Sequence, residues 1–346
     1  MRVSGKHYQT LWYENGFINF IDQNSLPFLF RIRKTDDYRI LCQAIIDMDI
    51  RGAGAIGVAA GWAMALAIRE ADKQSNPDLI SIAYQEIRST RPTAQDLFHA
   101  CDFVFQHRNH PVDAIDAAQI LHSNNIQEAI KIGEFGEELI HQNSRILTHC
   151  NAGWLAFADW GSALAPVYKA ARNNKSPFVY VDETRPRMQG ARLTAWELLN
   201  ENIEFRIIAD NAAAHLMMNG AIDIIITGAD RIARNGDIAN KIGTLQKALA
   251  ANYFGIPFYV AAPKSTFDKF CESGKDIPIE NRNEDEVLYI QGQDQDSTLR
   301  KIRIAAPGAH ALNPAFDVCP ASLISGIITS KGIIKANTTE ILSLLE

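Results

Sequence analysis

The run IDIIITGAD, residues 222–230, decides the fold of this chain. Its centre is continuously apolar, which is typical of a strand buried on both faces of a parallel sheet. Similar runs recur after residue 144, and segments with helical apolar spacing separate them. The expected strands are RILTHC (145–150), FVYVDE (178–183), EFRIIAD (204–210), IDIIITGAD (222–230) and PFYVAAP (257–263), and the expected helices cover 163–173, 192–200, 212–220 and 242–255. This alternation predicts a doubly wound, mainly parallel α/β sheet.

The first 130 residues have a different texture. Residues 1–32 hold short alternating runs separated by turn signals, and they predict a small antiparallel sheet. Apolar residues then recur at helical spacing, which predicts helices over 36–48, 57–71, 77–87 and 94–105, and GEFGEELI (133–140) predicts a further helix. We therefore expect an N-terminal small sheet and helical domain over residues 1–130, followed by the α/β domain over residues 131–346.

Composition argues against several classes of partner and cofactor. The net charge is −6 and no basic block occurs, which argues against nucleic acid, although local Arg and Lys residues still allow an anionic substrate. Five widely spaced cysteines without a C-x-x-C pair argue against a disulfide framework, and the absence of clustered Cys and His patterns argues against a metal. No signal peptide or membrane-spanning run is evident. We expect a cytoplasmic protein that binds no membrane.

Polar residues follow all five expected strands, which is more than a packing scaffold needs. In open α/β sheets, ligands bind outside the carboxyl ends of the strands, so these residues mark the expected site. They are His149-Cys150-Asn151, Asp182-Glu183-Thr184-Arg185, Asp210-Asn211, Gly228-Ala229-Asp230-Arg231 and Ala262-Pro263-Lys264.

Cys150 and Asp230 are the strand-end residues best suited to chemistry. Cys150 could be a buried inert cysteine, but a strand end that leads into a helix start favours the thiolate. His149 beside it should face the other way and be structural. Asp230 follows the most apolar strand, where partial desolvation favours the protonated acid and suits proton transfer. The alternative for Asp230 is a helix N-cap or a salt bridge to Arg231 or Arg234.

Two further segments indicate an anion site. RGAGAIG (51–57) satisfies G-x-G-x-x-G, but a dinucleotide fingerprint needs a preceding strand, and residues 42–50 read as helix. Glycines that expose amides at a helix start, with Arg51 beside them, fit a phosphate cradle better, and a tight interhelical turn is the alternative. Asn240-Lys241 is placed at an expected helix start, where a Lys opposes the macrodipole unless an anion binds.

Eight sequence blocks, in order over nearly the whole chain, resemble the methylthioribose-1-phosphate isomerase family. They are RGAGAIG (51–57), STRPTAQDLF (89–98), THCNAG (148–153), DETRPRMQGARLTAWEL (182–198), GADRIARNGDIANKIGT (228–244), IPFYVAAPKSTFD (256–268), IPIENRNEDEV (277–287) and NPAFDV (313–318). The wider group also contains ribose-1,5-bisphosphate and 5-deoxyribose-1-phosphate isomerases, and non-enzymatic regulatory subunits of a translation-initiation exchange factor. The presence of both Cys150 and Asp230 speaks against the non-catalytic branch.

The resemblance implies a cofactor-independent sugar-phosphate isomerase of methionine salvage that converts 5-methylthioribose 1-phosphate into 5-methylthioribulose 1-phosphate. It implies a homodimer and, after the helical part, a Rossmann-like sheet that binds no nucleotide. It also implies that Cys150 and Asp230 are catalytic. The substrate-binding positions that it implies are Arg51, Gly52, Ala53, Arg91, Gln189, Asn240 and Lys241.

The chain also departs from the family pattern. Gly54 stands at a usual proline, which predicts a looser loop. Trp154, Phe157 and the pair Arg187-Met188 also differ from the usual residues. If these side chains line the pocket around carbon 5 of the sugar, the 5-substituent would differ from methylthio, and 5-deoxyribose 1-phosphate is the alternative substrate.

Overall fold

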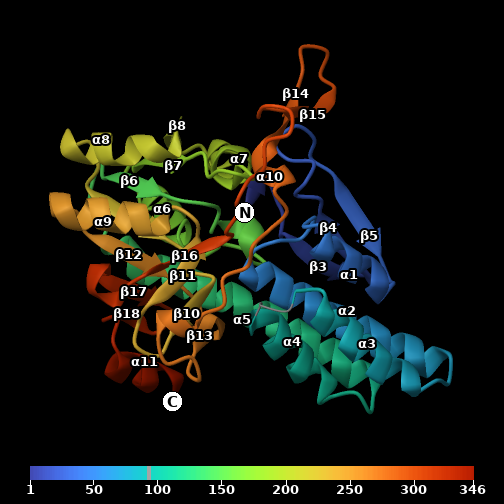
Figure 1. Cartoon of the computed structure of the whole chain (residues 1–346). Coiled ribbons are helices and arrows are strands. Elements are labelled where there is room, and N and C mark those ends of the chain that lie inside the picture. The colour runs from blue at the N-terminus through green and yellow to red at the C-terminus, as the bar shows by residue number, and fades with distance from the viewer. Residues whose placement is uncertain (92–94) are drawn as a thin grey trace.

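A seven-stranded sheet organises the second half of the chain, of which the computed structural model describes residues 1–91 and 95–346 (Figure 1). Its strands are β6 (Arg145–Thr148), β7 (Phe178–Asp182), β8 (Glu204–Ile208), β9 (Ile224–Thr227), β12 (Phe258–Ala261), β17 (Gly326–Thr329) and β18 (Gly332–Ile334). The order is β18-β17-β12-β9-β6-β7-β8, and only β18 is antiparallel to its neighbour. This order is that of a Rossmann-like sheet, with the topological switch point between β6 and β9. The doubly wound prediction is confirmed.

Helices cover both faces of this sheet, which explains why its strands are continuously apolar. Ile226 of β9 packs with Val167 of α6 (Ala165–Arg172), whereas the next residue back, Ile225, packs with Ala248 of α9 (Thr244–Phe254). Successive side chains on a strand point to opposite faces, so both sets must be apolar. The other flanking helices are α7 (Ala195–Asn200), α8 (Ala213–Met218) and α11 (Thr338–Leu345). All five expected strands and the four helices between them are present.

A second, four-stranded sheet was not expected. Its order is β13-β10-β11-β16, and its strands are β10 (Arg231–Ala233), β11 (Ile238–Lys241), β13 (Phe267–Asp268) and β16 (Phe316–Cys319). The turn between β10 and β11 contains Gly236, whose φ is 94°. The expected placement of Asn240-Lys241 at a helix start is therefore wrong, because both end a strand and α9 begins only at Thr244.

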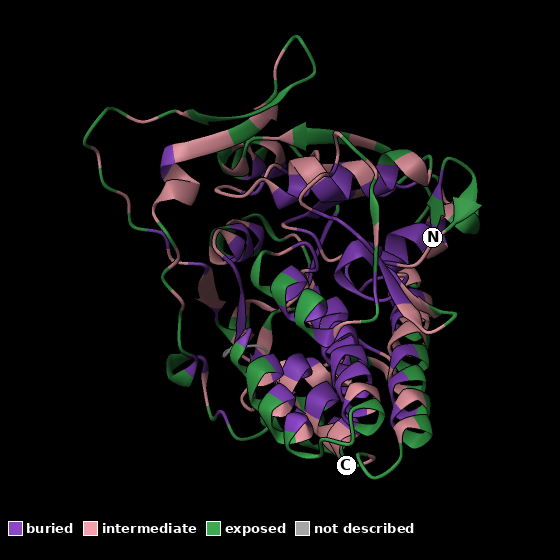
Figure 2. Ribbon diagram, turned by 90° about the vertical axis from the view of Figure 1, so that its right-hand side faces the viewer, coloured by how far each residue is buried: buried purple, intermediate pink, exposed green. Residues whose placement is uncertain are grey.

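The N-terminal part has the expected small sheet and helices. The strands are β1 (Arg2–Val3), β2 (Lys6–His7), β3 (Leu11–Glu14), β4 (Phe17–Ile21) and β5 (Ile32–Thr35), and the helices are α1 (Tyr38–Ile46), α2 (Ala53–Lys73), α3 (Asp78–Ser89), α4 (Gln95–Phe105) and α5 (Pro111–Glu137). Helix α2 is alanine-rich and almost wholly buried among its neighbours. Figure 2 shows the buried residues concentrated inside the molecule and the exposed ones on its outer surfaces.

Helix α5 joins the two halves of the chain. The expected helix over 133–140 is confirmed for residues 133–137, which are the last part of the longer helix α5. The same helix passes the expected boundary at residue 130, and it packs against α2 on one side and against α6 and β17 on the other. The division at residue 130 therefore stays a prediction. Residues 92–94, which include the first residue of the expected helix over 94–105, lie outside the described residues.

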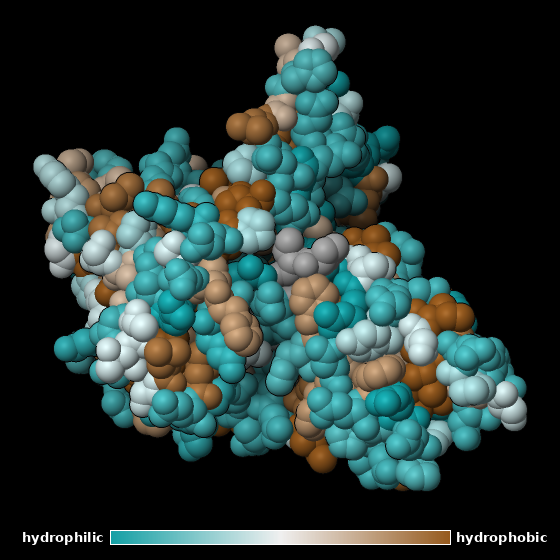
Figure 3. Space-filling view, turned by 60° about the horizontal axis from the view of Figure 1, so that its bottom comes forward, coloured by the Kyte–Doolittle hydropathy of each residue, from teal (hydrophilic) through white to brown (hydrophobic). Residues whose placement is uncertain are grey.

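The remaining elements lie mainly at the surface. A hairpin of β14 (Tyr289–Gln293) and β15 (Leu299–Arg303), preceded by α10 (Asp285–Leu288), projects from the body (Figure 1). Figure 3 shows apolar residues in small separate groups among hydrophilic side chains on one face of the molecule. Among the helices that the structure describes, none is long and apolar enough to cross a membrane.

Candidate active site

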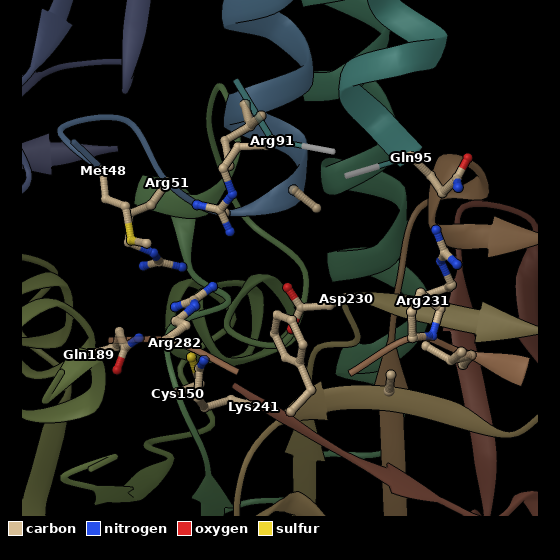
Figure 4. Close-up of a pocket in the computed structure, with 17 residues that line it drawn as sticks. Met48, Arg51, Arg91, Gln95, Cys150, Gln189, Asp230, Arg231, Lys241 and Arg282 are labelled. Atoms are coloured by element: carbon tan, nitrogen blue, oxygen red, sulfur yellow. The ribbon is translucent and has the colours of Figure 1, made fainter. Parts of the chain in front are cut away.

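A cavity lies at the switch point of the large sheet. Cys150 follows β6 and Asp230 follows β9, so the two residues leave adjacent strands on either side of that point. Eight of the nine expected site residues line this cavity, namely Arg51, Gly52, Ala53, Arg91, Cys150, Gln189, Asp230 and Lys241. The labelled side chains come from elements far apart in the sequence, and those of Arg51, Cys150 and Lys241 lie around one space, with Gln95 and Arg231 to one side (Figure 4).

Asn240 is the expected site residue that the structure does not bring into this lining. Adjacent residues on β11 point to opposite faces, so Lys241 faces the cavity and Asn240 faces away. The Asn240 side chain is buried and donates from Nδ2 to Oγ1 of Thr244 at 3.0 Å. This bond holds Asn240 to the first residue of α9.

Cys150 has a left-handed backbone with a φ of 65°, a conformation that is uncommon for residues other than glycine. Two threonines hold it there: the amide of Cys150 donates to Oγ1 of Thr184 at 2.9 Å, and Oγ1 of Thr194 donates to the carbonyl of Cys150 at 2.7 Å. Strained backbone of this kind persists where the surrounding structure over-determines it, often at functional sites. The two threonines therefore fix where the sulfur is presented.

The surroundings of Cys150 favour the thiol over the expected thiolate. Burial raises its pKa, and the positive charges of Arg51 and Lys241 only partly counter that effect. The expected helix start after Cys150 is also wrong, because a loop follows and leads to a single turn at Trp154–Ala156. The anion-stabilising helix dipole on which the thiolate prediction relied is therefore missing at this position.

The loop after Cys150 is anchored by Glu197, a fully buried residue of α7 that was missed from the sequence. Its carboxylate accepts hydrogen bonds from Asn151 Nδ2 at 2.8 Å, from the amide of Trp154 at 3.0 Å, from the amide of Leu155 at 3.2 Å and from the hydroxyl of Tyr168. Burial raises the pKa of Glu197 to about 7, against the effect of these donors. An acid within the apolar segment AWELL was the available signal.

Asn151, which is held by Glu197, in turn holds the side chain of Arg51 in place. The guanidinium of Arg51 donates to Oδ1 of Asn151 at 2.6 Å and to its carbonyl at 2.8 Å. Gly52 then caps α2 with a φ of 87°, and a Cβ at this position would lie 2.4 Å from the Cα of Ala156. Only glycine permits this close approach, which places the first amides of α2 against the cavity.

The cavity is rich in positive charge and offers an unused hydrogen-bond acceptor. Burial lowers the pKa of Lys241 to about 8, and the neighbouring charge of Arg282 acts in the same direction. Burial likewise lowers the pKa of Arg91, again with help from Arg282. Oε1 of Gln189 is buried and has no hydrogen-bond partner among the described residues. Together with the α2 amides, these groups suit a phosphate and the hydroxyl of a polar ligand.

Asp230 lines the cavity but is exposed, so the expected partial desolvation of its carboxylate is not found. Its amide donates to the carbonyl of Ala239 at 2.9 Å. Within the described chain its side chain makes no hydrogen bond or ion pair, whereas Arg231 lies 3.7 Å from Asp268 and Arg234 lies 2.9 Å from Glu272. The salt-bridge alternative is therefore not observed, and the carboxylate is open to a ligand.

The residues that depart from the family pattern are not among those that line the cavity. Trp154 is buried beside Trp196, and Arg187 donates to Glu286 at 2.9 Å; none of Trp154, Phe157, Arg187 and Met188 is part of the lining. The suggestion that they surround carbon 5 of the sugar is not supported. The expected looser loop at Gly54 is also wrong, because Gly54 lies in the first turn of α2, against Phe157.

One group of side chains has the proximity needed for a metal, but most of its ligand atoms already have protein partners, the buried Oδ1 of Asp182 being the exception among the described residues. His149, Asp182 and Asp210 bring their ligand atoms within 4.8 Å of one another. However, the two ring nitrogens of His149 pair with Asp182 at 2.8 Å and with the carbonyl of Ile242 at 2.9 Å, and the ammonium of Lys247 lies 2.9 Å from Asp182. This network braces β6 and β7, and it keeps His149 out of the cavity lining.

Comparisons with known proteins agree over nearly the whole chain. The model of the initiation factor 2 subunit family matches residues 49–336. The methylthioribose-1-phosphate isomerase of Sulfurimonas denitrificans is 45% identical over 97% of this chain and 98% of that protein, and the one of Acetivibrio thermocellus is 45% identical over 94% and 96%.

Two solved structures have the same fold along most of their length. The 5-methylthioribose 1-phosphate isomerase from Pyrococcus horikoshii OT3 matches with a TM-score of 0.86 and 38% identity, over 98% of this chain and 96% of that chain. The translation initiation factor eIF-2B, subunit delta, from A. fulgidus matches with a TM-score of 0.84 and 34% identity, over 97% and 100%.

Proposed function

This chain belongs to the initiation factor 2 subunit family, and we propose that it is an aldose–ketose isomerase that converts 5-methylthioribose 1-phosphate into 5-methylthioribulose 1-phosphate in methionine salvage. One observation supports this most strongly: a thiol and a carboxylate leave adjacent strands at the switch point and face a cavity with several basic side chains. Acid–base groups beside a phosphate-binding cradle are what such an isomerisation requires.

The phosphate on the anomeric carbon dictates the first step. It prevents the free aldehyde form, so the ring must open by cleavage of the bond between carbon 1 and the ring oxygen. A proton is delivered to the ring oxygen as that bond breaks, and the oxygen that carries the phosphate stabilises the cation at carbon 1. Cys150, kept as a thiol by burial, and Asp230 are the groups that supply this acid–base help.

The second step moves hydrogen from carbon 2 to carbon 1, and loss of the proton from the hydroxyl on carbon 2 leaves the ketone. A proton route removes the hydrogen to a base and passes through an enol. A hydride route needs apolar walls that keep water out, and Met48, Ile56 and Ile277 line this cavity. Turnover in deuterated water tests the routes: label at carbon 1 supports proton transfer, and its absence is compatible with hydride transfer and with a proton route whose base does not exchange with water.

The remaining groups position the substrate. Arg51 and the α2 amides at Gly52 and Ala53 face the cavity and suit the phosphate, while Lys241 adds charge and Gln189 offers its unused oxygen to a sugar hydroxyl. In this proposal no step uses a cofactor. We also propose that the enzyme acts as a homodimer in the cytoplasm, as the resemblance of the sequence blocks implies.

A non-catalytic role is the second candidate, because the relative from A. fulgidus is named as a translation-factor subunit. The buried Gln189 oxygen, which has no partner in the described part of the chain, and the constrained Cys150 argue for catalysis. Turnover of 5-methylthioribose 1-phosphate, compared with 5-deoxyribose 1-phosphate and followed by NMR, tests the proposal. A higher kcat/KM for the methylthio sugar is expected. Failure to isomerise either sugar would overturn the proposal, and a preference for the deoxy sugar would change the substrate.

A further inference from the structure

Arg282 lines the same cavity as Cys150 and Lys241, and no sequence pattern assigned it a role. We propose that Arg282 is a substrate-binding residue that donates its guanidinium to the phosphate of the sugar, beside Lys241 and Arg91. This inference rests on the proposed function for the identity of the ligand, while the anion site itself is argued from the side chains alone.

The Arg282 side chain is buried, and not all of its N–H donors are hydrogen-bonded to described residues. Only 8% of it is exposed, and its buried Nε has no hydrogen-bond partner among the described residues. The nearest acid is Glu280, whose Oε2 lies 3.4 Å from Nε and 3.4 Å from Nη2. Guanidinium–carboxylate hydrogen bonds are normally about 2.7–2.9 Å long, so Glu280 satisfies this group poorly. A buried cation of this kind calls for an anionic partner.

The backbone around Arg282 is fixed in place by an antiparallel pairing. The amide of Arg282 donates to the carbonyl of Asn313 at 2.9 Å, Asn281 bridges to Pro314, and the amide of Ala315 donates to the carbonyl of Glu280 at 2.8 Å. The segment 313–315 continues directly into β16. Arg282 is therefore carried on a small extension of the second sheet rather than on a free surface loop.

Strand β16 also connects Arg282 to Lys241. Phe316 pairs with Lys241 across β16 and β11, and its ring lies 4.7 Å from Nζ of Lys241 and 5.6 Å from Cζ of Arg282. One aromatic ring thus supports two cations, which aromatic faces attract at such distances. Figure 4 shows Arg282 and Lys241 directed into the same space as Cys150.

Crowding of like charges indicates what binds between them. After burial, the charge of Arg282 is the largest cause that lowers the pKa of Lys241. The same holds for the pKa of Arg91. Cations that disfavour one another's charged form are stabilised together when an anion enters. Asp230 is the one carboxylate among the described lining residues, whereas Arg51, Arg91, Lys241 and Arg282 are basic; Arg231, also in the lining, is paired with Asp268. A phosphate dianion meets this excess of positive charge.

The test compares Arg282→Gln and Arg282→Lys with the matched control Arg300→Gln. Arg300 is exposed on β15 and pairs with Asp294, so its loss changes net charge equally without touching the cavity. For Arg282→Gln we expect KM to rise roughly 10- to 100-fold, as for loss of a charge-assisted hydrogen bond, with kcat changed less. Arg282→Lys should fall between this variant and the wild type, and Arg300→Gln should match the wild type.

Inorganic phosphate separates this inference from the proposed function. Its binding, measured by calorimetry, should weaken in Arg282→Gln and be unchanged in Arg300→Gln, whichever sugar the enzyme turns over. Unchanged phosphate binding and unchanged KM in folded Arg282→Gln would overturn the role of Arg282. If that variant does not fold, wild-type phosphate affinity and KM in Arg282→Lys would overturn it equally, because a point charge cannot reproduce the planar fork.

Discussion

Replacement of Gly54 by Ala tests how the phosphate-binding end of α2 is packed. A Cβ at Gly54 would lie 2.7 Å from Cδ1 and 3.0 Å from Cε1 of Phe157, and 2.9 Å from Nδ2 of Asn125. Neither neighbour moves freely. Phe157 is only 5% exposed and packs with Ala129, and Oδ1 of Asn125 accepts from the amide of Ala158 at 2.9 Å. Either the ring or the first turn of α2 must therefore shift.

The magnitude follows from two opposing effects. Overpacking of a well-packed site costs about 1–3 kcal/mol. The higher helix propensity of Ala offsets roughly 1 kcal/mol of this. We therefore expect Gly54→Ala to lower the free energy of unfolding by about 0–2 kcal/mol. Phe157→Ala alone should cost about 3–5 kcal/mol, because it leaves a cavity. In that background Gly54→Ala meets only Asn125, so it should cost less than in the wild type.

The assay is a double-mutant cycle on the wild type, the two single variants and the double variant, each followed by urea unfolding. We expect a coupling energy of about 1–3 kcal/mol, favourable in the double variant. KM should rise in Gly54→Ala, since the displaced turn carries Gly52 and Ala53. Effects that add to within about 0.5 kcal/mol would refute the reasoning, because they would mean that the two positions do not contact each other.

Three further predictions concern the site itself. Cys150→Ser should lose several orders of magnitude in turnover with little change in Tm, because the volume is nearly kept; near-normal turnover would make the cysteine structural. Since the pKa of Lys241 is lowered to about 8, kcat/KM should fall as the pH rises past that value, and Lys241→Arg should retain binding to higher pH; an unchanged basic limb in this variant would assign it to another group. Glu197→Gln should lower the free energy of unfolding by about 3 kcal/mol, because the new amide NH₂ group faces N–H donors that the carboxylate accepts. Glu272→Gln, at an exposed position, should leave the free energy of unfolding unchanged. Equal stability of the two variants would show that Glu197 does not anchor the loop.

The large sheet was predictable because its signal is local. Each of β6, β7, β8, β9 and β12 is a short apolar run with a polar residue at its end. Because ligands of open α/β sheets bind outside the carboxyl ends of the strands, these residues also locate the site. Cys150 and Asp230 could be picked out by their position alone, before any family resemblance. The cradle at Arg51 and Gly52 was also readable, since no strand precedes it.

The second sheet was not predictable because its pairings are long-range. Strand β10 pairs with β13 across more than thirty residues, and strands of two to four residues carry almost no periodicity. Because this sheet was not predicted, Lys241 was expected at a helix start, and no role was expected for Arg282. The bonds from Glu197 to the Cys150 loop likewise join segments more than forty residues apart in sequence. The left-handed backbone of Cys150 is held by its bonds to Thr184 and Thr194 rather than by its neighbours in sequence.

The central claim is that Asp230 acts with Cys150 in proton transfer. Its most direct test is Asp230→Asn, with turnover, substrate affinity and Tm measured on one preparation. The amide keeps the volume but cannot exchange a proton at working pH. Because the Asp230 side chain makes no bond to another described residue, Tm should not change. We expect turnover to be abolished and affinity to stay within about tenfold, since the charge-assisted contacts are made by other residues. A variant that still turns over but melts at a lower temperature would contradict the account.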